Sequence, residues 1–140
     1  MIVHIFASDK MHPAVASLQE IAIGSGKMFV IDNLDDLIGG DVLIAYHATI
    51  LVPRFIYEKY KYRLVLHASK LPDGAGWSPL NWSILNGDEI FWLSLVEMNE
   101  KVDSGNLVSQ VQFKIEPHLL FDQAMKILCN QEIKMIESLI

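Results

Sequence analysis

The sequence predicts an α/β fold, compact and three-layered, with a mostly parallel twisted sheet. Short apolar runs rich in Val, Ile and Leu alternate with segments of helical periodicity, which is typical of buried parallel strands joined by helices. The chain has 140 residues, of which 51% are hydrophobic, and it contains no repeat or linker-like segment. We therefore expect one domain over residues 1–140, with a shortened N-terminal half and a C-terminal helix.

The first 40 residues predict two short strands and one helix. Residues 2–7 predict a strand, and Pro13 then stands at the first position of a helix that ends at Gly24-Ser25-Gly26. Residues 28–31 predict a second strand. The segment 32–40 indicates a turn with at most a short helix, so the second crossover is unusually short.

The remaining elements continue the alternation of strand and helix before two strands follow in succession. Strands are predicted at 41–47, 62–67, 89–98 and 107–115, and helices at 53–60, 80–85 and beyond Pro117, the last with a break near Asn130.

Composition excludes several classes of function. A net charge of -6 leaves no basic surface for a nucleic-acid backbone. Cys129 is the only cysteine, so there is no intramolecular disulfide, no Cys/His zinc spacing and no predicted metal site. No apolar run approaches the roughly 20 residues that span a bilayer, and no signal segment precedes the first strand. We expect a cytoplasmic protein that neither binds nucleic acid nor crosses a membrane.

Polar residues close several of the predicted strands. Ser8, His47, His67 and Ser69 each end or follow a strand, and ligands of parallel sheets bind at the carboxyl ends of the strands. An imidazole at His67 and a carboxylate at Asp103 are suited to proton transfer. Two plainer interpretations stay open: residues 71–79 are a Pro/Gly connection, and Asp103 belongs to an ordinary turn.

The spacing of these residues resembles a known family. The pattern covers residues 41–117 and resembles the formyltransferases that use 10-formyltetrahydrofolate, whose fold is Rossmann-like. It begins with Asp41-Val42-Leu43-Ile44-Ala45-Tyr46 and continues as His67-x-Ser69-x-Leu71-Pro72-x-x-x-Gly76-x-x-Pro79-x-x-Trp82-x-Ile84-x-x-Gly87. It ends with Met98-x-x-x-x-Asp103-Ser104-Gly105-x-Leu107.

The resemblance implies a role for particular residues. It makes His67 and Asp103 the catalytic pair. It implies that Ser69, Gly76, Trp77 and Asn81 lie beside an amine substrate, and that the formyl donor contacts Tyr46, His47, Ile50, Glu97 and Asn99.

One position departs from the family pattern. Two residues before the histidine the family has Asn, which helps to hold the oxyanion, and here this residue is Val65. Either Ser69, Asn81 or a backbone amide replaces it, or the domain is a catalytically degenerate module that binds folate or a nucleotide sugar. Hydrolysis of the formyl donor is a third interpretation.

The loop sequence is most similar to the branch that formylates amino sugars for surface polysaccharides. This similarity implies a small-molecule amine, a nucleotide-linked amino sugar, as the acceptor, and the acidic balance argues against tRNA. The apolar positions of the last helix add the expectation of a homodimer.

Overall fold

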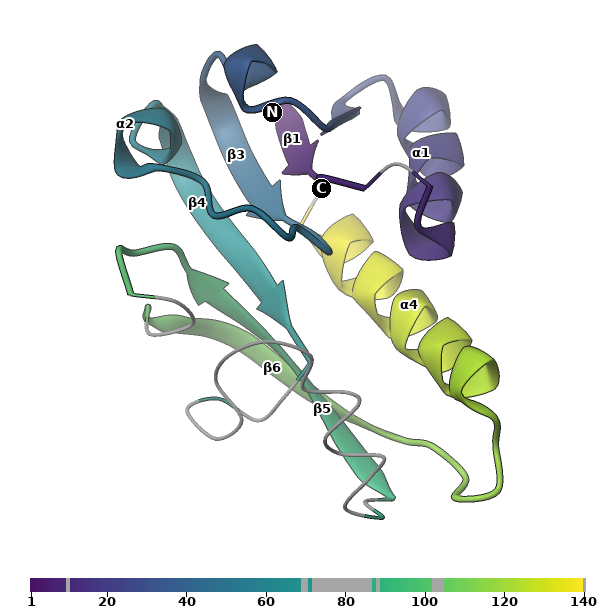
Figure 1. The fold of residues 1–140 in the computed structure, drawn as a ribbon. Helices are drawn as coiled ribbons and strands as arrows, with labels where there is room; N and C mark the ends of the chain where they lie inside the picture. Colours follow the sequence, from purple (N-terminus) through teal and green to yellow (C-terminus); the bar gives the residue numbers. More distant parts are fainter. Residues whose placement is uncertain (10, 69–70, 72–86, 88, 102–104, 140) are drawn as a thin grey trace. The chain divides into compact units, whose positions relative to one another are not determined.

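The computed structural model describes residues 1–9, 11–68, 71, 87, 89–101 and 105–139. Within these residues the chain forms two compact units, 1–65 and 66–139. Figure 1 labels their helices and strands.

The first unit is built around parallel strands. β1 (Val3–Phe6), β2 (Met28–Ile31), β3 (Gly40–Ala45) and β4 (Tyr60–His67) lie in the order β2-β1-β3-β4, and β4 continues into the second unit. Ile5 is aligned with Val30 on one side and Ile44 on the other. Ile5 and Ile44 are fully buried, so the near-continuous apolar runs in the sequence are the core of this sheet.

Helix α1 (Pro13–Ser25) packs beside β2 and has the predicted ends. The Nδ1 atom of His12 accepts a hydrogen bond from the backbone N–H of Ala14 at 3.2 Å, which caps the helix. Pro13 stands at the first helical position, and Gly26 closes the helix in the left-handed conformation.

The connection from β2 to β3 is as short as the sequence predicts. It contains only the 3-10 helix η1 (Leu34–Asp36), capped by the Asn33 side chain, which accepts a hydrogen bond from the N–H of Asp35 at 2.9 Å. Gly39 has a φ of 108°, and a Cβ there would lie 3.0 Å from the carbonyl oxygen of Lys59. Only glycine fits this close approach without strain.

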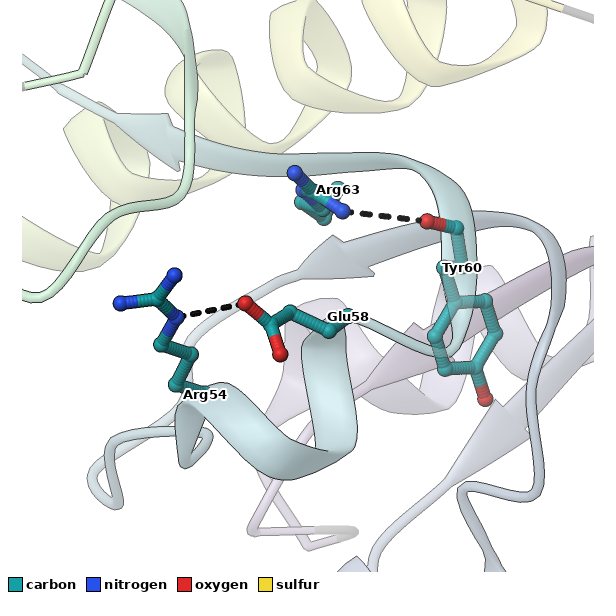
Figure 2. Close-up of polar contacts among 4 residues, drawn as sticks. All are labelled: Arg54, Glu58, Tyr60 and Arg63. Carbon is teal, nitrogen blue, oxygen red and sulfur yellow. Dashed lines mark hydrogen bonds and ion pairs between the residues drawn. The ribbon is translucent and has the colours of Figure 1, made fainter.

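Helix α2 (Arg54–Tyr57) is a single turn that precedes β4. Figure 2 shows the ion pair between Arg54 and Glu58 and the hydrogen bond from Arg63 to the carbonyl oxygen of Tyr60 at 3.4 Å. Tyr57 is buried, and the Arg63 guanidinium lies over its ring at 5.7 Å. The Arg54–Glu58 ion pair is exposed, and exposed ion pairs stabilise a structure little. The turn is therefore held mainly by the burial of Tyr57 and by the Arg63 guanidinium on its ring.

The second unit pairs β5 (Ile90–Glu97) with β6 (Leu107–Lys114) in antiparallel fashion. Their register is irregular between Leu95 and Val96. The rings of Phe91 and Phe113 lie opposite each other and are stacked with centroids 6.1 Å apart. The same unit contains α4 (Phe121–Ser138), whose buried residues are Ala124, Leu128, Cys129, Glu132, Met135 and Ile136.

The predicted α/β class, the parallel strands and the C-terminal helix are confirmed, with three corrections. The helix predicted at 53–60 is only the single turn α2, because the chain enters β4 at Tyr60. β3 ends at Ala45 and not at His47, because the chain turns into a left-handed conformation at His47. Helix α4 runs unbroken through Asn130, whose side chain is exposed, so the predicted break is wrong. The predicted helix at 80–85 lies outside the described residues. In the part of the chain that the structure describes, no helix is long and apolar enough to cross a membrane.

Candidate active site

The strand order of the first unit indicates where a ligand would bind. The chain leaves β1 toward β2 on one side and returns to β3 on the other, so the direction of winding reverses between β1 and β3. In parallel α/β sheets, ligands bind beyond the carboxyl ends of the strands at this reversal. The residues just after β1 and β3 are therefore the first candidates in this unit.

A side chain after β1 holds the loop after β3. The Ser8 Oγ accepts a hydrogen bond from the backbone N–H of Thr49 at 2.7 Å, and it lies 2.9 Å from the Thr49 Oγ1. These contacts join two segments that are 41 residues apart along the chain. Ser8 was a predicted rim residue, and Thr49 lies in the segment 45–51 that the resemblance places at the folate pocket, but the contact between them was not predicted.

Among the described non-glycine residues, only His47 has a left-handed backbone conformation, with a φ of 47°. Histidine is one of the residues that occupy this region more often than most, at some cost in conformational energy. Its ring stacks on that of His12, with centroids 4.4 Å apart and an interplanar angle of 22°. It also meets the Tyr46 ring edge-on at 4.6 Å. His47, just after β3, and His12, at the start of α1, thus form one aromatic stack.

The residues predicted to contact the formyl donor in this unit differ in exposure. Tyr46 is fully buried, His47 is half-buried, and Ile50 is 51% exposed. Leu51 beside it is also exposed. The loop after β3 therefore offers an imidazole ring and apolar side chains at the surface, which is chemistry suited to a flat aromatic ligand.

In the second unit, His67 is the last residue of β4 and is 7% exposed. It lies at the carboxyl end of a strand, as predicted. Val65, which stands where the family has Asn, is half-buried on the same strand and is aligned with Ala45 of β3.

Leu71 follows His67 by four residues and is tied to the β5–β6 pair. Its N–H donates to the Ser94 Oγ at 3.3 Å, and its carbonyl oxygen accepts from the Gln110 Nε2 at 3.3 Å. Gln110 also donates to the Ser94 Oγ at 2.9 Å. Ser94 and Gln110 face each other across the strands, and Ser94 is fully buried. The sequence carried one signal for this network, a single Ser within the apolar run of β5.

The loop that carries Asp103 leaves β5 and returns to β6 through a tight closure. The N–H of Glu97 donates to the carbonyl oxygen of Asn106 at 2.9 Å, and the Asn106 Nδ2 lies 3.4 Å from the Glu97 Oε2. A Cβ on Gly105 would overlap the carbonyl oxygen of Glu97. The Gly of the Asp-Ser-Gly sequence is therefore required by the close approach of two backbones. Asn99 caps its own turn, with its Oδ1 accepting from the Lys101 N–H at 3.0 Å.

Several predicted site residues lie outside the described residues. These are Asp103, Ser69, Gly76, Trp77 and Asn81, and their roles stay predictions. The roles of His67, Tyr46, His47, Ile50, Glu97 and Asn99 also stay predictions, with the positions given above.

Comparison with known proteins assigns the chain to a family. Residues 21–140 match the family model described as Formyl transferase, and the chain belongs to this family. A methionyl-tRNA formyltransferase from Agathobacter rectalis is 30% identical over 105 residues, which are 69% of this chain and 34% of that protein. The chain spans about a third of the length of this relative.

Solved structures share the fold. A methionyl-tRNA formyltransferase from Clostridium thermocellum matches with a TM-score of 0.75 and 22% identity, over 99% of this chain and 65% of that one. A Mycobacterium tuberculosis protein provisionally described as a sugar N-formyltransferase matches with a TM-score of 0.71 and 17% identity, over 98% and 65%. HypX from Aquifex aeolicus, solved with tetrahydrofolic acid, matches with a TM-score of 0.66 and 20% identity, over 83% and 22%.

Proposed function

We propose that this protein transfers a formyl group from 10-formyltetrahydrofolate to a primary amine, with a nucleotide-linked amino sugar as the acceptor. The observation that carries the proposal is the family match over residues 21–140, which includes a buried histidine at the end of β4. The structural neighbour that contains tetrahydrofolic acid supports a folate donor, and the neighbour described as a sugar N-formyltransferase supports a sugar acceptor.

The residues that would hold the folate are those of the loop after β3 and of the end of β5 with the segment that follows it. Tyr46, His47 and Ile50 belong to the first set, and Glu97 and Asn99 to the second. The exposed apolar surface of Ile50 next to the half-buried His47 ring fits an aromatic ligand. When bound, the folate supplies the one-carbon unit at the formyl oxidation level.

In the proposed mechanism, two side chains stabilise the charges that develop during the reaction. A neutral amine uses its lone pair to form the new C–N bond, and negative charge develops on the carbonyl oxygen. His67, in its protonated form, donates a hydrogen bond to this oxygen. Asp103 orients His67 or favours its imidazolium form, and it helps to remove the proton that the amine loses. The bond from the formyl carbon to the donor nitrogen then breaks, and that nitrogen leaves with a proton.

The test is an assay of the purified protein with 10-formyltetrahydrofolate. Release of tetrahydrofolate is followed by absorbance and the product amine by mass spectrometry, with separate reactions for a nucleotide-linked amino sugar, methionyl-tRNA and no acceptor. We expect product with the amino sugar. Product with methionyl-tRNA alone would show that the acceptor is a tRNA and not an amino sugar. Formate released without an acceptor would indicate hydrolysis of the formyl donor.

Variants of the two proposed catalytic residues complete the test. His67→Ala and Asp103→Asn are each expected to lower kcat by about 100-fold or more, on the scale of a lost oxyanion donor or general base. Arg54→Ala, which changes an exposed side chain of α2, is the control and keeps the native rate. Native rates in either catalytic variant would show that the roles are wrong.

Val65 favours a second function, a binding module without turnover. The oxyanion donor expected at this position is absent because valine has no hydrogen-bonding side chain. Calorimetry with tetrahydrofolate and with nucleotide sugars, run beside the turnover assay, separates the two functions. Binding without product in any reaction would support the module, and measurable product eliminates it.

A further inference from the structure

The amide of Gln110 makes two hydrogen bonds with one nitrogen. Its Nε2 lies 3.3 Å from the carbonyl oxygen of Leu71 and 2.9 Å from the Oγ of Ser94. A carbonyl oxygen only accepts, so the NH₂ end of the amide must face Leu71. The Ser94 Oγ in turn accepts from the N–H of Leu71 at 3.3 Å. Both backbone polar groups of Leu71 are therefore satisfied by two side chains of the β5–β6 pair.

The surroundings of Leu71 make these bonds important for the placement of its backbone. It is buried, with 7% of its surface exposed, and the next residue, Pro72, has no N–H to donate. A buried backbone group without a partner is costly, so the bonds to Ser94 and Gln110 determine where this residue lies on the hairpin. The same hairpin leads, through the closure at Gly105, into the loop that carries Asp103.

We propose that Gln110 is a positioning residue for formyl transfer, because it fixes the backbone of Leu71, four residues after His67, on the β5–β6 pair. The inference rests on the proposed function. Gln110 touches no reacting atom; it acts through Leu71. A displacement of about 1 Å in a reacting group is enough to cost about 100-fold in rate, so a hydrogen bond remote from the chemistry affects turnover.

The decisive variant is Gln110→Met, which keeps the length of the side chain and removes both donors. The matched control is Gln112→Met, on the same strand, where the native Gln is exposed and lies opposite Trp92. We expect Gln110→Met to lower kcat by about 10- to 100-fold while the KM for the formyl donor changes by less than about threefold. Gln112→Met is expected to keep both constants within about twofold.

A second measurement does not depend on turnover. Hydrogen exchange of the backbone amide of Leu71, read by mass spectrometry of short peptides, is expected to accelerate at least tenfold in Gln110→Met and to stay native in Gln112→Met. If the native protein transfers no formyl group to any acceptor, the proposed function fails, and this exchange measurement still decides whether Gln110 holds Leu71.

A double variant separates positioning from general stability. Ser94→Ala and Gln110→Met remove partners of the same backbone, so their combined effect on kcat is expected to be smaller than the product of the single effects. Native exchange at Leu71 in Gln110→Met would overturn the proposal. So would a fall in kcat that only tracks the folded fraction, or a fully multiplicative double variant.

Discussion

Gly105 and Glu97 approach each other so closely that a Cβ on the glycine would overlap the backbone carbonyl oxygen of the glutamate. The contact closes the loop between β5 and β6, beside the hydrogen bond from the Glu97 N–H to the Asn106 carbonyl. It gives a steric reason for the glycine of Asp103-Ser104-Gly105, independent of any catalytic role for the aspartate.

Gly105→Ala is therefore expected to destabilise the protein by about 1–3 kcal/mol, the usual cost of an added methyl group in a packed site. The measurement is urea unfolding followed by circular dichroism. Gly24→Ala is the matched control, because Gly24 lies within α1 and a Cβ there meets no atom within 4 Å. The control is expected to gain about 0.5–1 kcal/mol from helix propensity. Equal effects of the two substitutions would refute the steric argument.

Ser8 is expected to contribute more to the loop after β3 than Thr49 does. Ser8→Ala removes the acceptor of the Thr49 N–H and is expected to cost about 1 kcal/mol, with faster hydrogen exchange at residues 47–51. Thr49→Val removes only the hydroxyl and keeps the N–H bond to Ser8, so its cost is expected to be smaller. A larger loss in Thr49→Val would contradict this order.

We expect His4 to make the stability of the protein depend on pH. Its Nδ1 lies 2.7 Å from the Tyr60 hydroxyl, and burial lowers the pKa of His4 from the ordinary value of 6.5. The unfolded chain then binds more protons at this site than the folded chain, so the contribution of His4 is complete above pH 6.5. It is lost as the pH falls from 6.5 through the lowered pKa.

The comparison of the native protein with His4→Phe isolates the pH-dependent contribution of His4 to the free energy of unfolding. The difference in free energy of unfolding, native minus variant, is expected to decrease as the pH falls from 7.5 to 5. Its slope stays below about 1.4 kcal/mol per pH unit, the limit for one proton. Denaturant titrations across this range provide the measurement, and a difference that does not change with pH would disprove the linkage.

The sequence was sufficient for the elements whose ends are marked by local chemistry. Pro13 and Gly26 set the ends of α1 because a proline fits the first turn and a glycine fits the left-handed cap. β1 and β2 were recognisable from their apolar runs. Their order in space, with β1 between β2 and β3, was not predicted and comes from the structure, which places Ser8 and His47 just beyond strand ends.

The contacts of the candidate site depend on distant pairs of residues, and here the sequence was insufficient. No local pattern links Ser8 to Thr49, or Gln110 to Leu71, because 41 and 39 residues separate the partners. His12 was recognised only as the residue before Pro13, whereas its ring also stacks on His47. Such pairs become visible only when strand order and register are known.

Asn130 shows how burial overrides local propensity. Asparagine is a poor helix former, and the sequence therefore predicted a break, yet α4 continues because buried residues on both sides, Leu128 and Met135 among them, keep the helical register. The exposed Asn130 side chain then only weakens the helix. Asn130→Ala is expected to raise the free energy of unfolding by about 0.5 kcal/mol, the difference in helix propensity. Urea titration measures the gain. A loss of stability would mean that the Asn130 side chain makes a contact that the helix needs.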